Sequence, residues 1–248
     1  MELMRANEIT VDNAKLLSDF VFERKYDGSR ALVIDGDIYS EREICRNDRF
    51  PQIHNELKGI NATFDGEIFI EGKCVLDLNA KKNWREAKFC VFDILSYNGI
   101  DLRNKPLLDR KRILTEVISG EFKAISLPQS WSSLDTAWNE VLNRNLEGLM
   151  AKNLNSPYEM RRTSTWLKIK RRRCIDVEIL SHEIGSTKGT FIIKMPSGVE
   201  ARVSGTSEDI VKFYNEHKPK KMEINYMYLT PSGFPFQPTF SKFIGDVI

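Results

Sequence analysis

Cysteine and long apolar runs are scarce in this sequence, and each shortage excludes a class of protein. The four cysteines are scattered and none forms a CxxC pair, so neither a zinc cluster nor a disulfide framework is predicted. No apolar run approaches the length of a membrane span, and the opening segment MELMRANEIT lacks the apolar core of a secretion signal. We therefore expect a cytoplasmic protein in a reducing compartment, with no membrane partner.

Net charge is also small. At +2 it does not by itself indicate a nucleic-acid partner, so the distribution of charge matters more than its sum. Hydrophobic residues make up 41% of the 248 positions, which is enough for a sizeable core in one large domain or two modest ones.

The first two thirds of the chain mix strand and helix patterns. The runs ALVI and IYS flank an Asp-Gly-Asp turn and predict a hairpin, and a second hairpin is predicted over 62–78 with its turn at Glu71–Lys73. The apolar run 87–95 predicts a strand buried on both faces. Further predicted elements are helices at 107–118 and 132–145, the second capped by Ser132 or Ser133, and short strands at 147–153 and 165–170.

The character of the sequence changes near Arg173. Short strand patterns at 176–184, 190–203 and 220–230, joined by Gly- and Pro-bearing turns, predict a small β-barrel, with one helix at 207–218. We therefore predict two domains, residues 1–172 and 173–248, with the basic stretch WLKIKRRRC at the join.

The hexapeptide KYDGSR, from Lys25 to Arg30, combines groups that are useful in chemistry. Lysine is a nucleophile if burial or nearby cations lower its pKa. Gly28 lets a backbone approach a ligand closely, and Arg30 can hold a phosphate through two parallel hydrogen bonds. An exposed charged turn between strands is the alternative interpretation of these six residues.

Four further clusters follow along the chain. Asp65 and Glu67 lie two apart on a predicted strand and so share a face, as do Lys168 and Lys170 in TWLKIK. The other two are Phe92–Asp93 in CVFDIL and Glu147 with Lys152 in EGLMAKN. Taken singly, each is more typical of a solvated charge or a core aromatic than of a site.

In their order, the motifs KxDGxR, DGE, FD, EG and KxK resemble those of the covalent nucleotidyltransferases, which include ATP-dependent DNA ligases, RNA ligases and mRNA capping guanylyltransferases. The segments SPYEMRRTSTWLKIK and RNDRFPQI resemble the ATP-dependent DNA ligases in particular. The implied fold is α+β: an ATP-grasp-like adenylation domain of antiparallel sheets and helices, followed by a small OB-fold barrel. The implied activity is the sealing of 5′-phosphate/3′-hydroxyl nicks in duplex DNA, in repair or replication. The resemblance also implies a monomer in the cytoplasm, and the protein could be associated with the nucleoid or encoded by a phage.

The resemblance also assigns roles to residues. Lys25 would attack the α-phosphate of ATP and form a lysyl-adenylate, with Asp27 supporting the site through hydrogen bonds. Lys168 and Lys170 would contact that phosphate and help to keep Lys25 deprotonated by like-charge repulsion. The implied nucleotide-binding set is Glu23, Lys25, Gly28, Arg30, Glu67, Phe92, Glu147, Lys152, Lys168 and Lys170.

Within that set, Phe92 would stack on the adenine, Glu23 would lie near it, and Arg30 would hold the ribose or a phosphate. Glu67 and Glu147 are hard oxygen ligands suited to Mg²⁺, with Mn²⁺ as an alternative.

The DNA contacts implied are basic. Arg42 loosely matches the arginine that would hold the 5′-phosphate at the nick, although Glu41 takes that place in an ungapped alignment. The short stretch before Lys25 leaves no room for the large N-terminal DNA-binding domain of replicative ligases, so we expect the two domains to hold DNA alone. The predicted backbone contacts are Arg161, Arg162, Arg171, Arg172 and Arg173, for which a solvated strand edge is the alternative.

Other functions stay open at this point. The shared motifs report the nucleotide rather than the polymer, so RNA joining competes with DNA joining. The lysine pair in TWLKIK and the ending QPTFSKF favour a DNA ligase over a capping enzyme. A non-catalytic nucleic-acid-binding module would keep the barrel and the basic stretch, but the intact reactive residues argue against it.

The last motif is altered. In QPTFSKFIGDVI, Lys242 and Asp246 fit the motif with which the OB-fold of ligases orients pyrophosphate, whereas Ile244 and Val247 replace the usual arginine and lysine. Two interpretations are open: Lys242 carries the role of this domain in self-adenylation alone, or self-adenylation is weak.

Substitution Lys242→Ala tests the first interpretation. We expect slower formation of the lysyl-adenylate, because the pyrophosphate loses its remaining cation, while sealing of a pre-adenylated nick is unchanged. Both rates are measured with labelled ATP and with a pre-adenylated nicked duplex. If neither rate changes, Lys242 has no such role.

Overall fold

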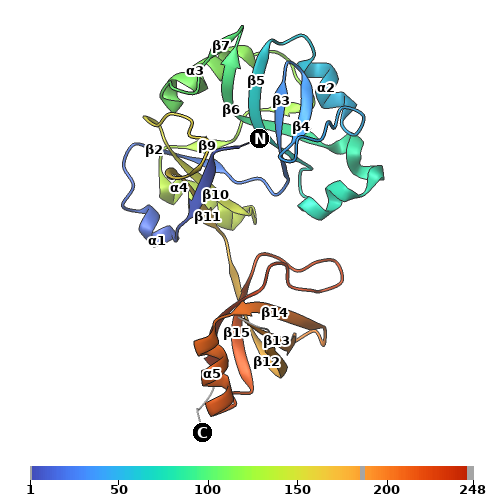
Figure 1. Cartoon of the computed structure of the whole chain (residues 1–248), viewed down its shortest axis with the longest axis vertical. Coiled ribbons are helices and arrows are strands. Elements are labelled where there is room, and N and C mark those ends of the chain that lie inside the picture. The colour runs from blue at the N-terminus through green and yellow to red at the C-terminus, as the bar shows by residue number, and fades with distance from the viewer. Residues whose placement is uncertain (1, 185–187, 245–248) are drawn as a thin grey trace. The chain divides into compact units, whose positions relative to one another are not determined.

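The computed structural model describes residues 2–184 and 188–244. It divides the chain into two compact units, Met1–Lys170 and Arg171–Ile248, so the division falls two residues before the boundary predicted at Arg173. Each unit has its own sheets and core (Figure 1).

One sheet of the N-terminal unit has the strand order β1-β11-β10-β2-β9. Its strands are β1 (Arg5–Glu8), β2 (Phe20–Arg24), β9 (Ser130–Trp131), β10 (Gly148–Asn153) and β11 (Arg162–Lys170). The short helix α1 (Val11–Ala14) and the helix α4 (Leu134–Asn143) pack against it around a core that includes Phe22, Val141 and Leu149. The hydroxyl of Ser133 caps α4, as one of the two predicted alternatives requires.

The second sheet has the order β4-β3-β5-β6-β7, with β8 pairing β6. Its strands are β3 (Ser29–Ile34), β4 (Asp37–Ser40), β5 (Ala62–Phe69), β6 (Lys88–Tyr97), β7 (Ile100–Asp101) and β8 (Ile125–Ser126). Helix α2 (Pro51–Leu57) packs against β4 and helix α3 (Leu107–Val117) packs against β6 (Figure 1). The predicted β3–β4 hairpin is confirmed, and both turn residues, Asp35 and Gly36, have the positive φ that a tight hairpin turn needs.

The second predicted hairpin is wrong. Strand β5 pairs with β3 and β6, and the chain after Gly72 forms two 3₁₀ turns, η1 (Val75–Asn79) and η2 (Lys81–Glu86). The carboxylate of Asp77 accepts the backbone N–H of Cys74 at 3.0 Å, and this local bond favours a turn over a strand ladder.

A small cluster of buried residues joins the two sheets. Leu32 on β3 and Leu95 on β6 pack with Trp166 on β11, together with Leu3, Met4 and Tyr158. The faces that carry the predicted reactive residues are thereby held opposite each other.

The C-terminal unit is one antiparallel sheet of order β14-β13-β12-β15-β16. Its elements are β12 (Arg173–Ile184), β13 (Gly189–Lys194), β14 (Glu200–Thr206), α5 (Glu208–His217), β15 (Lys221–Tyr226) and β16 (Thr239–Ile244). The edge strands β14 and β16 come into contact, so the sheet curls into a small barrel around Phe191, Val203 and Ile224. The prediction of an α+β domain followed by a small OB-fold barrel is confirmed. Among the described residues, no helix is both long and apolar enough to cross a membrane.

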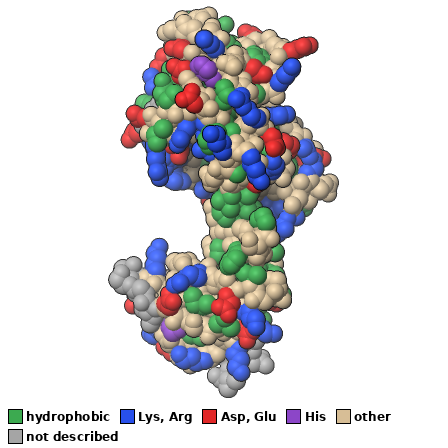
Figure 2. All heavy atoms as spheres, turned by 90° about the vertical axis from the view of Figure 1, so that its right-hand side faces the viewer, with side chains coloured by type: hydrophobic (Ala, Val, Ile, Leu, Met, Phe, Trp, Pro, Cys, Tyr) green, Lys and Arg blue, Asp and Glu red, His purple; other side chains and the backbone are tan. Residues whose placement is uncertain are grey.

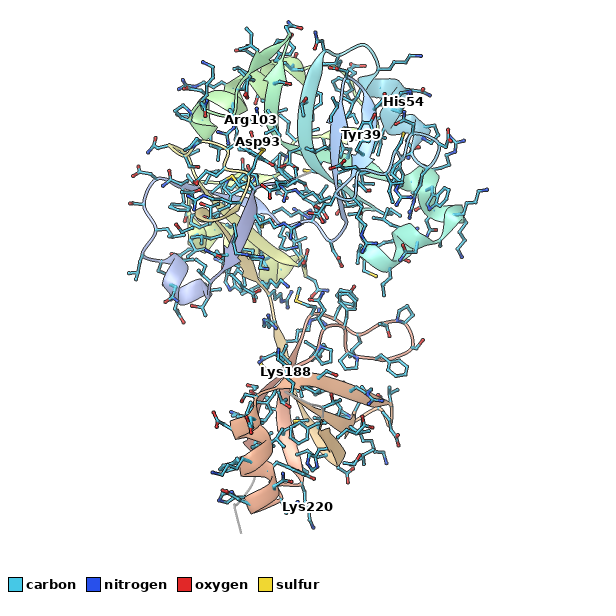
Figure 3. The ribbon with its side chains drawn as sticks, viewed as in Figure 1. Tyr39, His54, Asp93, Arg103, Lys188 and Lys220 are labelled. Carbon is cyan, nitrogen blue, oxygen red and sulfur yellow. The ribbon has the colours of Figure 1, made fainter. Side chains whose placement is uncertain are left out.

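A buried ion pair fixes α3 to the central strand β6. Nε and Nη2 of Arg110 each donate a 2.8 Å hydrogen bond to the carboxylate of Asp93, and neither side chain is exposed (Asp93 is labelled in Figure 3). Nη1 of Arg110 also donates to the carbonyls of Lys105 and Ser156, which ties the helix to two loops.

Removing one partner of this pair leaves a buried charge without compensation. We expect Arg110→Ala to lower the free energy of unfolding by about 3–5 kcal/mol, measured by urea denaturation. The exposed Arg112 on the same helix is the control, and Arg112→Ala should cost less than about 1 kcal/mol. Equal losses in the two variants would contradict the prediction.

Candidate active site

Strand pairing brings the distant motifs to one place. The backbone N–H of Lys25, just after β2, donates to the carbonyl of Gly148 at 3.0 Å, and Gly148 is the register partner of Lys170 on β11. On the other sheet, Arg30 of β3 pairs with Glu67 of β5. The reactive groups of both sheets therefore converge on the space between them.

A pocket occupies this space. Six of its lining residues belong to the predicted nucleotide-binding set, namely Glu23, Lys25, Arg30, Glu67, Phe92 and Lys152. Met4, Tyr26, Cys90, Met150 and Trp166 also line it. Burial and the charge of Glu23 raise the pKa of the Cys90 thiol to about 12.

Lys25 is ion-paired in this structure. Its Nζ lies 2.6 Å from Oε1 of Glu147, and both side chains are largely buried. Burial alone would lower the pKa of Lys25, but the charges of Glu147, Glu67 and Asp27 outweigh it and raise that pKa above its ordinary value. The expectation that neighbouring cations keep Lys25 deprotonated is therefore wrong for the structure as it stands, because the nearest charges are carboxylates.

The two lysines of TWLKIK face the same acid. Nζ of Lys168 lies 3.6 Å and Nζ of Lys170 lies 4.0 Å from Oε2 of Glu8 on β1. Burial lowers the pKa of Lys170, Glu8 opposes this, and Lys168 and Lys25 lower it further. Lys170 is thus close enough to interact electrostatically with Lys25, but the carboxylates around Lys25 have the larger effect on the pKa of that lysine.

The predicted metal ligands, Glu67 and Glu147, are both held near Lys25. Burial raises the pKa of Glu67 to about 8, with Lys25 opposing and Glu147 adding to the rise, and the pKa of Glu147 is also raised. Oε2 of Glu147 is buried and has no hydrogen-bond partner among the described residues. Two acids that disfavour each other's charge, with an oxygen left unsatisfied, fit a divalent cation.

The inner end of the pocket holds a second buried charge cluster. Oε2 of Glu23 lies 2.8 Å from Nζ of Lys152, and Lys111 contacts the other oxygen. Nζ of Lys152 lies 4.2 Å from the ring centroid of Phe92 and 4.1 Å from that of Trp166. This end therefore offers aromatic surface and a hydrogen-bonding carboxylate side by side.

Arg30 is fixed by a bidentate pair. Its Nε and Nη2 donate to the carboxylate of the fully buried Asp65 at 2.9 and 2.6 Å, and Nη1 donates to the carbonyl of Met4. The hydroxyl of Tyr158 donates to the same carboxylate at 2.7 Å. Arg30 therefore lines the pocket with its guanidinium held in one orientation. Its contact with the ribose or a phosphate stays a prediction.

Gly28 allows a close approach of the neighbouring strand β5, whereas the approach of a ligand predicted for it stays a prediction. A Cβ atom there would lie 2.2 Å from the carbonyl oxygen of Ile68 and 3.0 Å from Cγ of Glu67. The glycine thus lets β3 and β5 bring Glu67 next to Lys25. Asp27 contributes its negative charge to both Lys25 and Glu147.

The predicted DNA contacts lie outside the pocket. Arg42 is exposed in the turn after β4; Arg161 is paired with Glu159, and Arg162 donates to the carbonyl of Ala6. Arg171, Arg172 and Arg173 begin the C-terminal unit, where Arg172 donates to Thr239.

The barrel motif is described only in part. Lys242 is exposed on β16 and lies 3.8 Å from Glu223, whereas Asp246 and Val247 lie outside the described residues.

Sequence reasoning missed several site residues. Trp166 precedes the lysine pair on β11, Tyr158 lies in SPYEMRR, and Glu8 and Lys111 belong to segments with no motif. The alternation of TWLKIK could have placed Trp166 on the face of Lys168 and Lys170, but nothing local distinguishes Lys111 from other cations on its helix.

A buried lysine beside paired acids, an aromatic pocket between two facing sheets and a separate OB-fold barrel together define the class of lysine-dependent nucleotidyltransferases. The chain belongs to the ATP-dependent DNA ligases, because the family described as "ATP dependent DNA ligase domain" matches residues 4–170. The prediction of an ATP-dependent DNA ligase is confirmed.

Individual relatives agree with this assignment. The SPbeta prophage-derived DNA ligase-like protein LigB of Bacillus subtilis is 24% identical over 231 residues, which cover 86% of this chain and 84% of that protein. A probable DNA ligase of Streptomyces avermitilis is 30% identical over 195 residues, which cover 68% of this chain but 38% of the relative.

Solved structures share the fold. A Lig E DNA ligase, described as binding DNA with a minimal scaffold, matches with a TM-score of 0.75 at 17% identity, covering 98% of this chain and 99% of that one. The ligase domain of LigD from M. tuberculosis matches with a TM-score of 0.65 at 20% identity, covering 98% of this chain and 95% of that one.

The raised pKa of Glu67 predicts a pH dependence of stability. Because the pKa in the folded state, about 8, exceeds the ordinary 4.5, the folded protein binds a proton that the unfolded chain releases between these values. This contribution is present below pH 4.5 and is lost as the pH rises through 8. Between pH 5.5 and 8.5, wild type should therefore lose more unfolding free energy than Glu67→Gln, by more than about 1 kcal/mol in urea titrations. Parallel pH profiles for the two proteins would show that Glu67 titrates normally.

Proposed function

We propose that this chain seals 5′-phosphate/3′-hydroxyl nicks in duplex DNA with ATP, through a lysyl-adenylate on Lys25 and an adenylated DNA end. The observation that carries the proposal is the position of Lys25, which lines the aromatic pocket together with Glu67 and whose Nζ is paired with Glu147. We also propose that residues 1–172 act as the adenylation domain and 173–248 as the OB-fold domain of a cytoplasmic monomer.

In the first step Nζ of Lys25 attacks the α-phosphorus of ATP. A nitrogen–phosphorus bond forms, the bond to the bridging oxygen breaks, and pyrophosphate leaves. Lys25 must give up a proton beforehand, since the surrounding carboxylates hold it protonated. Until then the ion pair with Glu147 holds the amine in one position, so that the side chain of Lys25 loses little conformational freedom when it attacks.

Glu67 and Glu147 are the residues that would hold Mg²⁺ or Mn²⁺, because their acids are close together and one oxygen of Glu147 is unsatisfied. When bound there, the cation would offset phosphate charge and cancel the carboxylate charges that raise the pKa of Lys25. Lys168 and Lys170 have Glu8 as their partner and would turn from it toward phosphate oxygens.

The inner end of the pocket suits a base. Phe92 and Trp166 supply ring surface, and Glu23 supplies an acceptor that an exocyclic amine can approach. Arg30, already oriented by Asp65, lies near the rings of Phe92 and Trp166 and can contact the ribose or a phosphate.

The later steps use the same centre. The adenylyl group moves from Lys25 to the 5′-phosphate of the nick, and the 3′-hydroxyl then displaces AMP to form the phosphodiester. We propose Arg42 as a contact for the 5′-phosphate, and Arg161, Arg162 and Arg171–Arg173 as contacts for the DNA backbone.

Labelling tests the proposal directly. With Mg²⁺ and α-labelled ATP, wild type should carry label on Lys25 in a peptide digest, and Lys25→Ala should fall to background because no amine remains there. Lys15→Ala, which removes an exposed lysine paired with Asp12, should label like wild type. Nicked DNA and nicked RNA duplexes then measure the polymer preference.

Parallel reactions with GTP and NAD give the contrary outcomes. Label from GTP alone would favour capping chemistry. Absence of label from every nucleotide, together with no sealing of a pre-adenylated nick, would sink the enzyme proposal.

A further inference from the structure

Three consecutive basic residues of α3 have different surroundings. Arg110 is buried in an ion pair, and Arg112 is exposed at the surface. The side chain of Lys111, between them, is largely buried, and its Nζ contacts the carboxylate of Glu23. Many lysine and arginine side chains lie at the surface, as Figure 2 shows for one side of the molecule. Lys111 is instead directed into the N-terminal unit.

Lys111 connects two parts of the inner end of the nucleotide pocket. Its Nζ contacts Oε1 of Glu23 on β2 and donates a 3.2 Å hydrogen bond to the carbonyl oxygen of Phe92 on β6. Of the described residues, Glu23 and Phe92 line the pocket and Lys111 does not. Any effect of Lys111 on a bound nucleotide therefore passes through these two residues.

The helix holds Lys111 in register with the strand. The neighbouring Arg110 donates two 2.8 Å hydrogen bonds to the buried carboxylate of Asp93, which directly follows Phe92 on β6. The helix is thus fixed to the strand next to the point where Lys111 meets the carbonyl of Phe92. Lys111 loses little further freedom when it contacts Glu23, since its backbone is already anchored.

The charge of Glu23 depends on its two lysine partners. Burial raises the pKa of Glu23, but the charges of Lys111 and Lys152 outweigh it and hold that pKa below its ordinary value. Of the two charges, that of Lys111 has the larger effect. Lys152 is itself fully buried, and burial lowers its pKa. Lys111 is therefore the main support of an ionised Glu23.

An ionised carboxylate accepts hydrogen bonds and donates none, and each of its oxygens can accept more than one N–H. A base with an exocyclic amine, such as adenine, can donate to Glu23. A base with a carbonyl at the same place, such as guanine, brings a second acceptor and leaves both acceptors unpaired in a buried site, which is costly. A protonated Glu23 would lose this distinction.

We propose that Lys111 is a positioning residue for base selectivity: it holds the Glu23 carboxylate as the acceptor for an exocyclic amine and fixes it relative to the ring of Phe92. This inference rests on the proposed function, which makes ATP the nucleotide that reacts with Lys25. It assigns to α3, outside the pocket, part of the choice between amino and carbonyl purines.

The test uses Lys111→Met in the full chain, which keeps the length of the side chain and removes its charge. Self-adenylation is measured over a range of concentrations of ATP and of purine riboside triphosphate, which lacks the exocyclic amine. In wild type, loss of the amine should raise KM roughly tenfold, the value of one hydrogen bond to a charged group. In Lys111→Met, KM for ATP should rise by a similar factor, so that the two nucleotides become nearly equivalent.

The maximal rate separates this role from a catalytic one. Lys111 acts on the base and not on the phosphorus, so the maximal rate with ATP should stay within about twofold of wild type. The preference for ATP over GTP, expressed as the ratio of their kcat/KM values, should fall roughly tenfold for the same reason.

Three further variants make the result specific. Lys111→Arg keeps the charge and should restore most of the selectivity. Arg112→Met removes the exposed cation next to it on α3 and should behave as wild type. In the Glu23→Gln background, Lys111→Met should cause no further loss of selectivity, because the carboxylate that it supports is already gone.

Equal increases in KM for both nucleotides in Lys111→Met would show a merely structural role and overturn the proposal, as would an unchanged KM or a lower maximal rate alone. Lys111→Gln, a second neutral variant, gives the same comparison if Lys111→Met does not fold. Calorimetric binding of the two triphosphates separates the hypotheses. Binding that prefers ATP without labelling of Lys25 would contradict only the proposed function, whereas binding without preference in wild type would overturn the role of Lys111.

Discussion

Burial of opposite charges between two facing sheets is the constraint on which the N-terminal unit depends. Lys25 with Glu147, Arg30 with Asp65, and Lys152 with Glu23 all lie in or beside one pocket. Each group would be costly to bury alone, and each is tolerated because its partner comes from another strand. Packing and reactivity are therefore coupled: the pairing that makes the site foldable also sets the protonation of its nucleophile.

This coupling determines the charge state of the nucleophile. Glu147 pairs with the ammonium of Lys25 and raises the pKa of that amine, so the side chain is oriented and its protonated form is favoured. The same carboxylate retains one unsatisfied oxygen, and Glu67 is disposed to stay neutral. A cation that binds here can use the unsatisfied oxygen of Glu147 and displace the proton of Glu67, so binding of cation and phosphate changes the charges of the site.

The sequence allowed the family, the two-part fold and the outline of the pocket to be predicted, because short motifs carry their own geometry. Lys25 and Gly28 lie at one strand end, and alternation placed Lys168 with Lys170. The sign of the pKa shift on Lys25 was mispredicted, because Glu147 approaches only through the pairing of Lys25 with Gly148. The turn after Gly72 was mispredicted as a strand because the capping bond of Asp77 was overlooked.

Cys90 gives the pocket a property that its motifs do not suggest. Its sulfur lines the pocket, yet with a thiol pKa near 12 it carries almost no thiolate at neutral pH. Oxidants and electrophiles react with the thiolate, so this sulfur is chemically quiet. Cys90 should therefore resist oxidation and alkylation although it lines the nucleotide pocket.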